Sequence, residues 1–190
     1  MSASILQHPP SDYIGGRFAP LPGETIASRD PAEPSRVIWC GSPDPAHVDQ
    51  AVAAARQASP QWAATSLEQR IAFLKRWADS TLKRAADIAS LITDEMGKTL
   101  AESLAEAKLL GDKVNNTLDR ISLGRITDYE TPLAASRKGV CRFKPHGVMA
   151  VIGPFNFPAH LPNGHFVPAL LQVGTAVSNM LWSKVSMRSG

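Results

Sequence analysis

Cysteine, aromatic residues and an excess of one charge are all scarce in this chain of 190 residues. Only two cysteines occur, Cys40 and Cys141, without a CxxC pair or a histidine-rich spacing. This pattern excludes a disulfide scaffold and a zinc knuckle, predicts no metal site, and favours a reducing compartment. The 20 Lys and Arg residues nearly balance the 17 Asp and Glu residues. Because no dense basic run with interleaved aromatics is present, we expect no nucleic-acid partner.

Long hydrophobic runs are also missing. No stretch approaches the roughly 20 apolar residues that span a bilayer, and the first dozen residues lack the basic and apolar regions of a secretory signal. The phosphate-binding patterns GxGxxG and GxxxxGK[ST] are absent as well. The sequence therefore predicts a soluble, cytoplasmic protein with no membrane partner, long enough for one domain or for part of a larger one.

Strand patterns are present at both ends of the chain. Short aromatic and β-branched pieces between Pro and Gly predict a small hairpin or edge strands around residues 13–18 and 37–40. Residues 137–145, RKGVCRFKP, alternate charged and apolar side chains, as a half-exposed strand requires. Residues 147–152 form a continuous apolar run, which predicts a strand buried on both faces.

Helical patterns occupy residues 44–121 between these strands. Apolar residues recur at helical spacing there and predict several amphipathic helices in succession. Pro60 is expected to end the first helix, and the last is expected to continue for about six turns to Ile121. The predicted helix boundaries are the capping boxes Ser66/Gln69 and Thr99/Glu102 and the closing residue Gly97.

The turn GPFNFP follows the predicted buried strand and contains Asn156. The carboxyl end of a buried strand is where open α/β proteins place their ligands. The two N–H donors of the Asn156 amide can stabilise a developing oxyanion, Phe155 and Phe157 can exclude water, and Pro154 and Pro158 restrict the backbone. The alternative, that Asn156 is a turn residue bonding its own backbone, stays open on spacing alone.

The polar residues after this turn carry no metal-site pattern. His160 and His165 lie five residues apart, which is not the spacing that places two ligands on one helical face. We interpret both as structural or helix-end groups. Asn163-Gly164 is predicted to form a turn or a local kink.

The motif FKPHGVMAVIGPFNFPAHLPNGHFVPALL closely resembles the NAD(P)-dependent aldehyde dehydrogenase superfamily, most of all succinylglutamate-semialdehyde dehydrogenases of arginine catabolism. YIGGRF, DPAEPSRVI and DEMGKTLAES extend the resemblance upstream, so that it covers about residues 11–171. It implies an α/β fold, the N-terminal part of the aldehyde dehydrogenase fold: a helical block, an incomplete Rossmann-like parallel sheet and an extended β-hairpin.

The resemblance also implies a division of the chain. Residues 1–130 would form the N-terminal hairpin and the helical part of the cofactor-binding domain, and residues 131–146 a strand segment resembling the oligomerisation arm. Residues 147–177 would begin the Rossmann-like sheet, and residues 178–190 would be a divergent tail. The parent enzyme is expected to be a homo-oligomer.

The chemistry implied by the resemblance is attack of a thiol on a small-molecule aldehyde, hydride transfer to NAD or NADP, and hydrolysis of the thioester. Asn156 matches the family asparagine that holds the oxyanion. Ile152, Gly153, Pro154 and Phe155 match the strand end that lies against the cofactor.

The chain departs from the family pattern in two places. The contexts of the nucleophile, F-x-x-x-G-Q-x-C, and of the base, L-E-x-G-G, do not occur, and Cys40 and Cys141 are interpreted as inert. Lys184 is followed by Val185 where the family has Lys-Pro, so no ribose role is assigned to it. We expect a truncated or frame-shifted product that is inactive alone, exposes apolar surface and is marginally stable or associates.

Two alternatives to this function stay open. The chain could be a non-catalytic interaction module that pairs with full-length homologues through residues 137–144. It could also belong to a dehydrogenase for another aldehyde.

Overall fold

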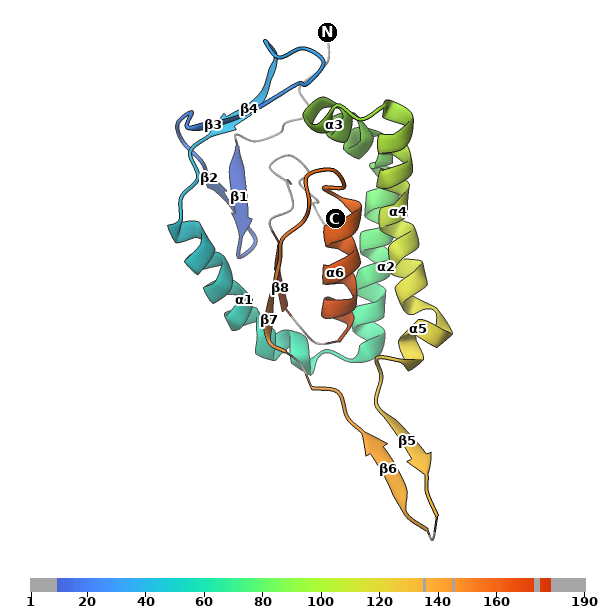
Figure 1. Cartoon of the computed structure of the whole chain (residues 1–190). Helices are drawn as coiled ribbons and strands as arrows, with labels where there is room; N and C mark the ends of the chain where they lie inside the picture. The colour runs from blue at the N-terminus through green and yellow to red at the C-terminus, as the bar shows by residue number, and fades with distance from the viewer. Residues whose placement is uncertain (1–9, 135, 145, 173–174, 179–190) are drawn as a thin grey trace.

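The computed structural model describes residues 10–134, 136–144, 146–172 and 175–178, and these residues combine helices and short strands, as the α/β prediction requires (Figure 1). The helices are α1 (Ala46–Ala64), α2 (Leu67–Lys83), α3 (Ala85–Met96), α4 (Leu100–Leu118), α5 (Arg120–Gly124) and α6 (His160–Leu171). The strands are β1 (Ser11–Ile14), β2 (Arg17–Pro20), β3 (Ile26–Arg29), β4 (Val37–Gly41), β5 (Tyr129–Pro132), β6 (Lys138–Cys141), β7 (Val148–Val151) and β8 (Thr175–Ser178).

Helices α2, α3, α4 and α6 enclose the two main apolar clusters. The first joins α3 to α4 and to the start of α6 through Ala85, Ile88, Ala89, Ile92, Ala107, Leu110 and Ala159. The second joins α2, α4, β7 and α6 through Leu74, Val114, Val151, Phe166, Val167 and Leu171. The apolar stripes of the helices therefore face one another, which is where burial of apolar area stabilises the chain.

The predicted helix ends are confirmed at three positions. Ser66 and Thr99 each accept the backbone N–H of the residue three positions on, and the Gln69 and Glu102 side chains bond back to the backbone of the cap, so both capping boxes are complete. Gly97 ends α3 in the left-handed region with φ 69°. A Cβ at this position would also lie 3.1 Å from Pro31 Cβ, so both backbone and space favour glycine there.

Three antiparallel hairpins, β1–β2, β3–β4 and β5–β6, lie outside the helical block. The predicted hairpin at residues 13–18 is confirmed, with Tyr13 paired to Phe18 across β1 and β2. Hairpin β5–β6 projects from the body of the molecule, at the end away from α3 (Figure 1).

Strands β7 and β8 pair in parallel, with Val148 opposite Thr175 and Val151 opposite Ser178. Helix α6 connects them, so this part of the chain is a β–α–β unit, the element from which Rossmann-like sheets are built. The strand pair lies between α1 and α6 (Figure 1). The turn after β7 is thereby placed at the carboxyl end of a parallel strand.

Two predicted helix boundaries are wrong. Pro60 lies inside α1, which continues to Ala64; the indole N–H of Trp62 donates to the Leu170 carbonyl at 2.9 Å and holds the segment after the proline in place. Helix α4 ends at Leu118, not near Ile121, because Asp119 starts a new helix by accepting the Ile121 N–H. Tertiary and capping bonds override the sequence pattern in both cases.

Two further expectations near the site are also corrected. Asn163 and Gly164 form no turn, because both lie within α6; the alternative of a local kink stays a prediction. Strand β7 is not buried on both faces: Val151 is buried, but Ala150 is exposed. Strand β7 has one strand partner among the residues described, so one of its two edges has no neighbouring strand there.

Candidate functional site

The turn between β7 and α6 contains all five residues predicted for the site. Ile152 leaves the strand with 84% of its surface exposed, and Phe155 is 79% exposed. Asn156 follows, with an exposed side chain. The structure therefore brings the predicted residues together. Residues 152–155 form an exposed, mostly apolar surface, called the ledge below, and the Asn156 amide lies beside it. Phe155 does not shield this amide from water within the described part of the chain.

Gly153 is required by the packing of this turn against α6. A Cβ built at Gly153 would lie 2.2 Å from Pro162 Cγ and 3.2 Å from its Cδ. Pro162 itself sits in the first turn of α6, where a missing N–H costs no helical hydrogen bond. The ledge can thus fold closely over the start of the helix only with glycine at this position.

Glu106, on α4, holds the N-terminus of α6. Its side chain is buried, and its Oε1 accepts the backbone N–H groups of Ala159 at 3.0 Å and His160 at 3.1 Å. These N–H groups have no partner within a helix, and a carboxylate at a helix N-terminus is favoured by the helix dipole. The carboxylate therefore acts as a cap that comes from a different helix.

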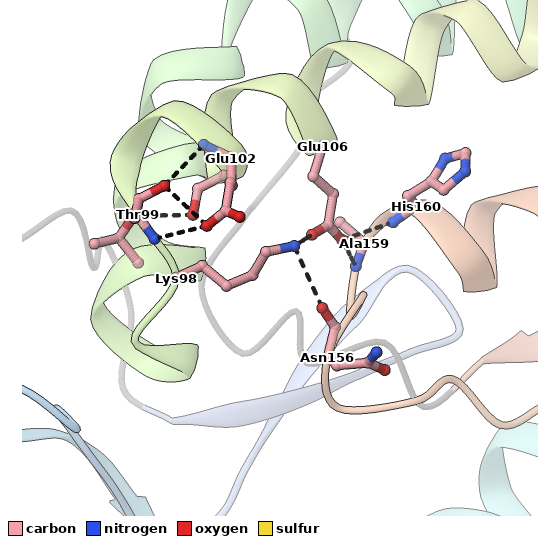
Figure 2. Close-up of polar contacts among 9 residues, drawn as sticks. Lys98, Thr99, Glu102, Glu106, Asn156, Ala159 and His160 are labelled. Atoms are coloured by element: carbon pink, nitrogen blue, oxygen red, sulfur yellow. Dashed lines mark hydrogen bonds and ion pairs between the residues drawn. The ribbon is translucent and has the colours of Figure 1, made fainter.

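Lys98 connects this carboxylate to the turn. Its ammonium lies 2.6 Å from Glu106 Oε2 and donates to the backbone oxygen of Asn156 at 3.3 Å. The same ammonium lies 3.9 Å from the centroid of the Phe157 ring, within cation–π range. Figure 2 shows the Asn156 amide pointing away from both charged groups. The backbone of Asn156 is held while its side chain is left available.

The rest of α6 is anchored by polar bonds to earlier helices. Arg70 on α2 is buried and donates through Nε to the Leu171 carbonyl at 2.9 Å, near the helix C-terminus. Burial lowers the pKa of this guanidinium from its ordinary value. In the middle of α6, the Asn163 amide donates to the Leu110 carbonyl at 3.0 Å and accepts the Trp77 indole N–H at 3.0 Å. These bonds therefore fix both the position of α6 and its rotation about its own axis.

The two cysteines lie on hairpins and not on this turn. Cys40 lies on β4 and Cys141 on β6, and both thiols are free and partly buried. Hairpin β5–β6, which carries Cys141, projects from one end of the molecule. The β7–α6 turn lies towards the other end (Figure 1). The turn that carries Asn156 therefore contains no thiol of its own.

Other kinds of site are absent from the described ranges. No group of three or more His, Cys, Asp or Glu side chains could hold a metal ion there. No helix among those residues is both long and apolar enough to cross a membrane. A separate hollow of about 480 Å³ is lined by residues of α1 and of the start of β7, including Arg56, Ser59 and His146. It does not include Asn156.

Lys98 and Glu106 were not singled out by the sequence. The signal for Glu106 is its helical spacing from Ser103 and Leu110. Both of these residues are fully buried in the structure, so Glu106 lies on the buried face of α4. A carboxylate at such a position needs a partner. The partner could not be read from spacing, since Ala159 lies 53 residues away.

Comparison with known proteins gives a consistent result. The model of the aldehyde dehydrogenase family matches residues 19–184. The N-succinylglutamate 5-semialdehyde dehydrogenase 2 of Caulobacter vibrioides is 42% identical over 166 residues, which is 87% of this chain and 34% of that protein. The chain thus spans about a third of the length of this curated relative.

Solved structures agree in fold. An aldehyde dehydrogenase from Brucella melitensis biovar abortus 2308 superposes with a TM-score of 0.80 at 28% identity, over 93% of this chain and 36% of that one. An NAD-dependent benzaldehyde dehydrogenase from Corynebacterium glutamicum superposes with a TM-score of 0.72 at 26% identity, over 89% of this chain and 37% of that one. The predicted partial aldehyde dehydrogenase fold is confirmed.

Proposed function

This chain belongs to the aldehyde dehydrogenase family, and from that premise we propose that its residues serve oxidation of an aldehyde to a carboxylic acid with NAD or NADP. The observation that carries the proposal is the position of Asn156. It lies at the carboxyl end of a parallel strand, on a turn whose backbone is held by Lys98 and Glu106, with its amide free. An amide on a turn whose backbone is held can donate to an oxyanion with little reorganisation of the main chain.

The substrate proposed is N-succinylglutamate 5-semialdehyde, an aldehyde of arginine catabolism. The support is the 42% identity to the Caulobacter vibrioides enzyme that carries this substrate in its name. A different aldehyde is the alternative within the same reaction class, because residues that select substrates need not lie in the matched third of the relative.

A nicotinamide cofactor fits the ledge formed by residues 152–155. Ile152 and Phe155 are exposed and apolar at the carboxyl end of β7, which suits a flat aromatic ring. The chemistry that such a cofactor supplies when bound is acceptance of a hydride. Ile152 and Phe155 would contact the ring, and Asn156 would donate its amide N–H to the substrate oxygen.

These residues alone do not complete the reaction. A thiol nucleophile and a general base are needed beside the amide, and Cys40 and Cys141 lie elsewhere in the fold. Catalytic groups act as a unit, so an oxyanion donor without them has little effect. We therefore propose that residues 1–190 by themselves show no turnover.

The decisive experiment joins residues 1–172 to the matching remainder of the Caulobacter vibrioides enzyme. With NAD or NADP, the chimera should oxidise N-succinylglutamate 5-semialdehyde, and Asn156→Ala should lower kcat about 10²- to 10³-fold with a smaller effect on KM. Asn116→Ala, an exposed asparagine on α4, is the matched control and should leave both constants unchanged. A folded chimera that keeps full kcat after Asn156→Ala would refute the assigned role.

A second candidate function is association with other copies of the family through hairpin β5–β6. The hairpin projects from the body (Figure 1) and exposes Tyr129, Leu133, Val140 and Phe143. Projecting apolar side chains beside unpaired strand edges are suited to pairing with another chain. Under this proposal, residues 131–146 form an oligomerisation arm, and the parent enzyme is a homo-oligomer. Co-purification with an intact dehydrogenase subunit, lost after Val140→Lys, would support it; co-purification unaffected by this change would contradict it.

A further inference from the structure

We propose that the ion pair between the half-buried Lys98 and the buried Glu106 positions Asn156, so that both are positioning residues of the oxyanion site. The inference rests on the proposed function in one respect only, the assignment of Asn156 as the oxyanion donor. Its structural part concerns how five consecutive residues, 156–160, are held by one ion pair.

Glu106 occupies a position that is costly for a carboxylate. The side chain is fully buried, and a buried carboxylate is unfavourable unless its oxygens are paired. Oε1 accepts two backbone N–H groups from the start of α6, and Oε2 receives the Lys98 ammonium. The two oxygens thus have separate roles, since one caps α6 and the other places the cation.

The contacts of this ion pair are distributed along the turn. Lys98 reaches the backbone oxygen of Asn156 and the ring of Phe157, and Glu106 reaches the N–H groups of Ala159 and His160. Contacts therefore hold the chain at and after Asn156. None of them uses its side chain, which points the other way (Figure 2). If these contacts only filled the interior, we would expect the Asn156 amide to take part in them as well.

The backbone on both sides of Lys98 is held in place. It is the single residue between the C-cap of α3, Gly97, and the N-cap of α4, Thr99. The left-handed glycine fixes the backbone before it, and the capping box formed with Glu102 fixes the backbone after it. Local structure thereby sets the direction in which this lysine leaves the main chain. Figure 2 shows Lys98 next to the capping box of Thr99 and Glu102.

The test uses the 190-residue chain labelled with ¹⁵N and follows the side-chain amide signal of Asn156, identified by its loss in Asn156→Asp. Lys98→Met and Glu106→Gln should shift or broaden this signal and raise amide hydrogen exchange across residues 156–160 at least tenfold. Lys98→Arg, which keeps the charge, should largely restore both. The matched control is Asp94→Asn, which removes the ion pair to Arg36 at 3.1 Å elsewhere in the fold.

The control should lower the thermal midpoint without moving the Asn156 signal. An unchanged Asn156 signal in Lys98→Met, or an equal change in Asp94→Asn, would overturn the proposal. Should Lys98→Met fail to fold, Glu106→Gln decides, since it keeps an acceptor for the two N–H groups. Unfolding of both, with Asp94→Asn folded, would likewise overturn the proposal, because the pair would then act on the whole fold.

Failure of the proposed function would look different. In the chimera with the Caulobacter vibrioides enzyme, Lys98→Met should lower kcat more than it changes KM, as expected for a misplaced oxyanion donor. An inactive chimera together with the spectral changes in the 190-residue chain would refute the function and leave the positioning role intact. Full kcat in Lys98→Met would refute the positioning role and leave the function intact.

Discussion

Replacing Glu106 by alanine should destabilise the chain more than any surface substitution. The change removes the buried carboxylate from its ion pair with the half-buried Lys98 at 2.6 Å, and with it two hydrogen bonds from the start of α6. Breaking a buried pair by removing one partner costs about 3–5 kcal/mol, and hydrogen bonds to a charged group are worth about 1.5–3 kcal/mol each. Because these contributions overlap, we expect the free energy of unfolding to fall by about 3–5 kcal/mol.

Urea unfolding followed by tryptophan fluorescence measures this change, since Trp62 and Trp77 both bond to α6. Lys98→Met alone should cost about 2–4 kcal/mol, because it leaves a buried carboxylate with only its two N–H donors. The double variant Lys98→Met/Glu106→Gln should recover part of the loss caused by Lys98→Met, since a neutral amide without a cation is less costly to bury than a carboxylate and its oxygen can still accept the two N–H groups. Additive losses in the double variant, or a loss below about 1 kcal/mol for Glu106→Ala, would refute the reasoning.

Two other predictions concern the packing of the site turn and the charge of the projecting hairpin. Gly153→Ala should lower the free energy of unfolding by about 1–3 kcal/mol because its Cβ meets the first turn of α6, whereas Gly124→Ala, with open space around it, should be neutral or stabilising in the same urea assay. Hydrogen bonds from Lys138 and then Arg142 lower the pKa of Glu130, so its stabilisation of β5–β6 is complete above the ordinary glutamate pKa and is lost as pH falls through the lowered one. Cross-strand amide signals in an NMR titration should follow this loss, and Glu130→Gln should abolish it.

Local signals in the sequence predicted local structure well. The capping boxes at Ser66 and Thr99 and the closing glycine Gly97 depend on residues three or four apart, and all three are confirmed. The strand, turn and helix around Asn156 also follow from the order of apolar residues, prolines and glycines. Such features are decided by backbone geometry within a few residues.

The predictions that failed depended on partners far along the chain. Pro60 continues a helix because Trp62 bonds to α6, and Asn163 stays in a helix because its amide is satisfied by α2 and α4. Glu106 was missed because its partners lie 53 and 54 residues away. The role of Asn156 stays a prediction, since an oxyanion donor is defined by reacting groups that must lie beside it.

Helix α6 has consequences for the order in which the chain folds. It contains Pro162, Gly164 and Pro168, so a peptide of this sequence should have little helix content of its own. Its ends are held by a carboxylate and a guanidinium, Glu106 and Arg70, that come from helices formed earlier in the sequence, with up to 101 residues between partners. Closing such long loops is slow compared with forming local helices. We therefore expect the helical block to act as a template on which α6 is completed late, so that the turn bearing Asn156 acquires its shape only once that template exists.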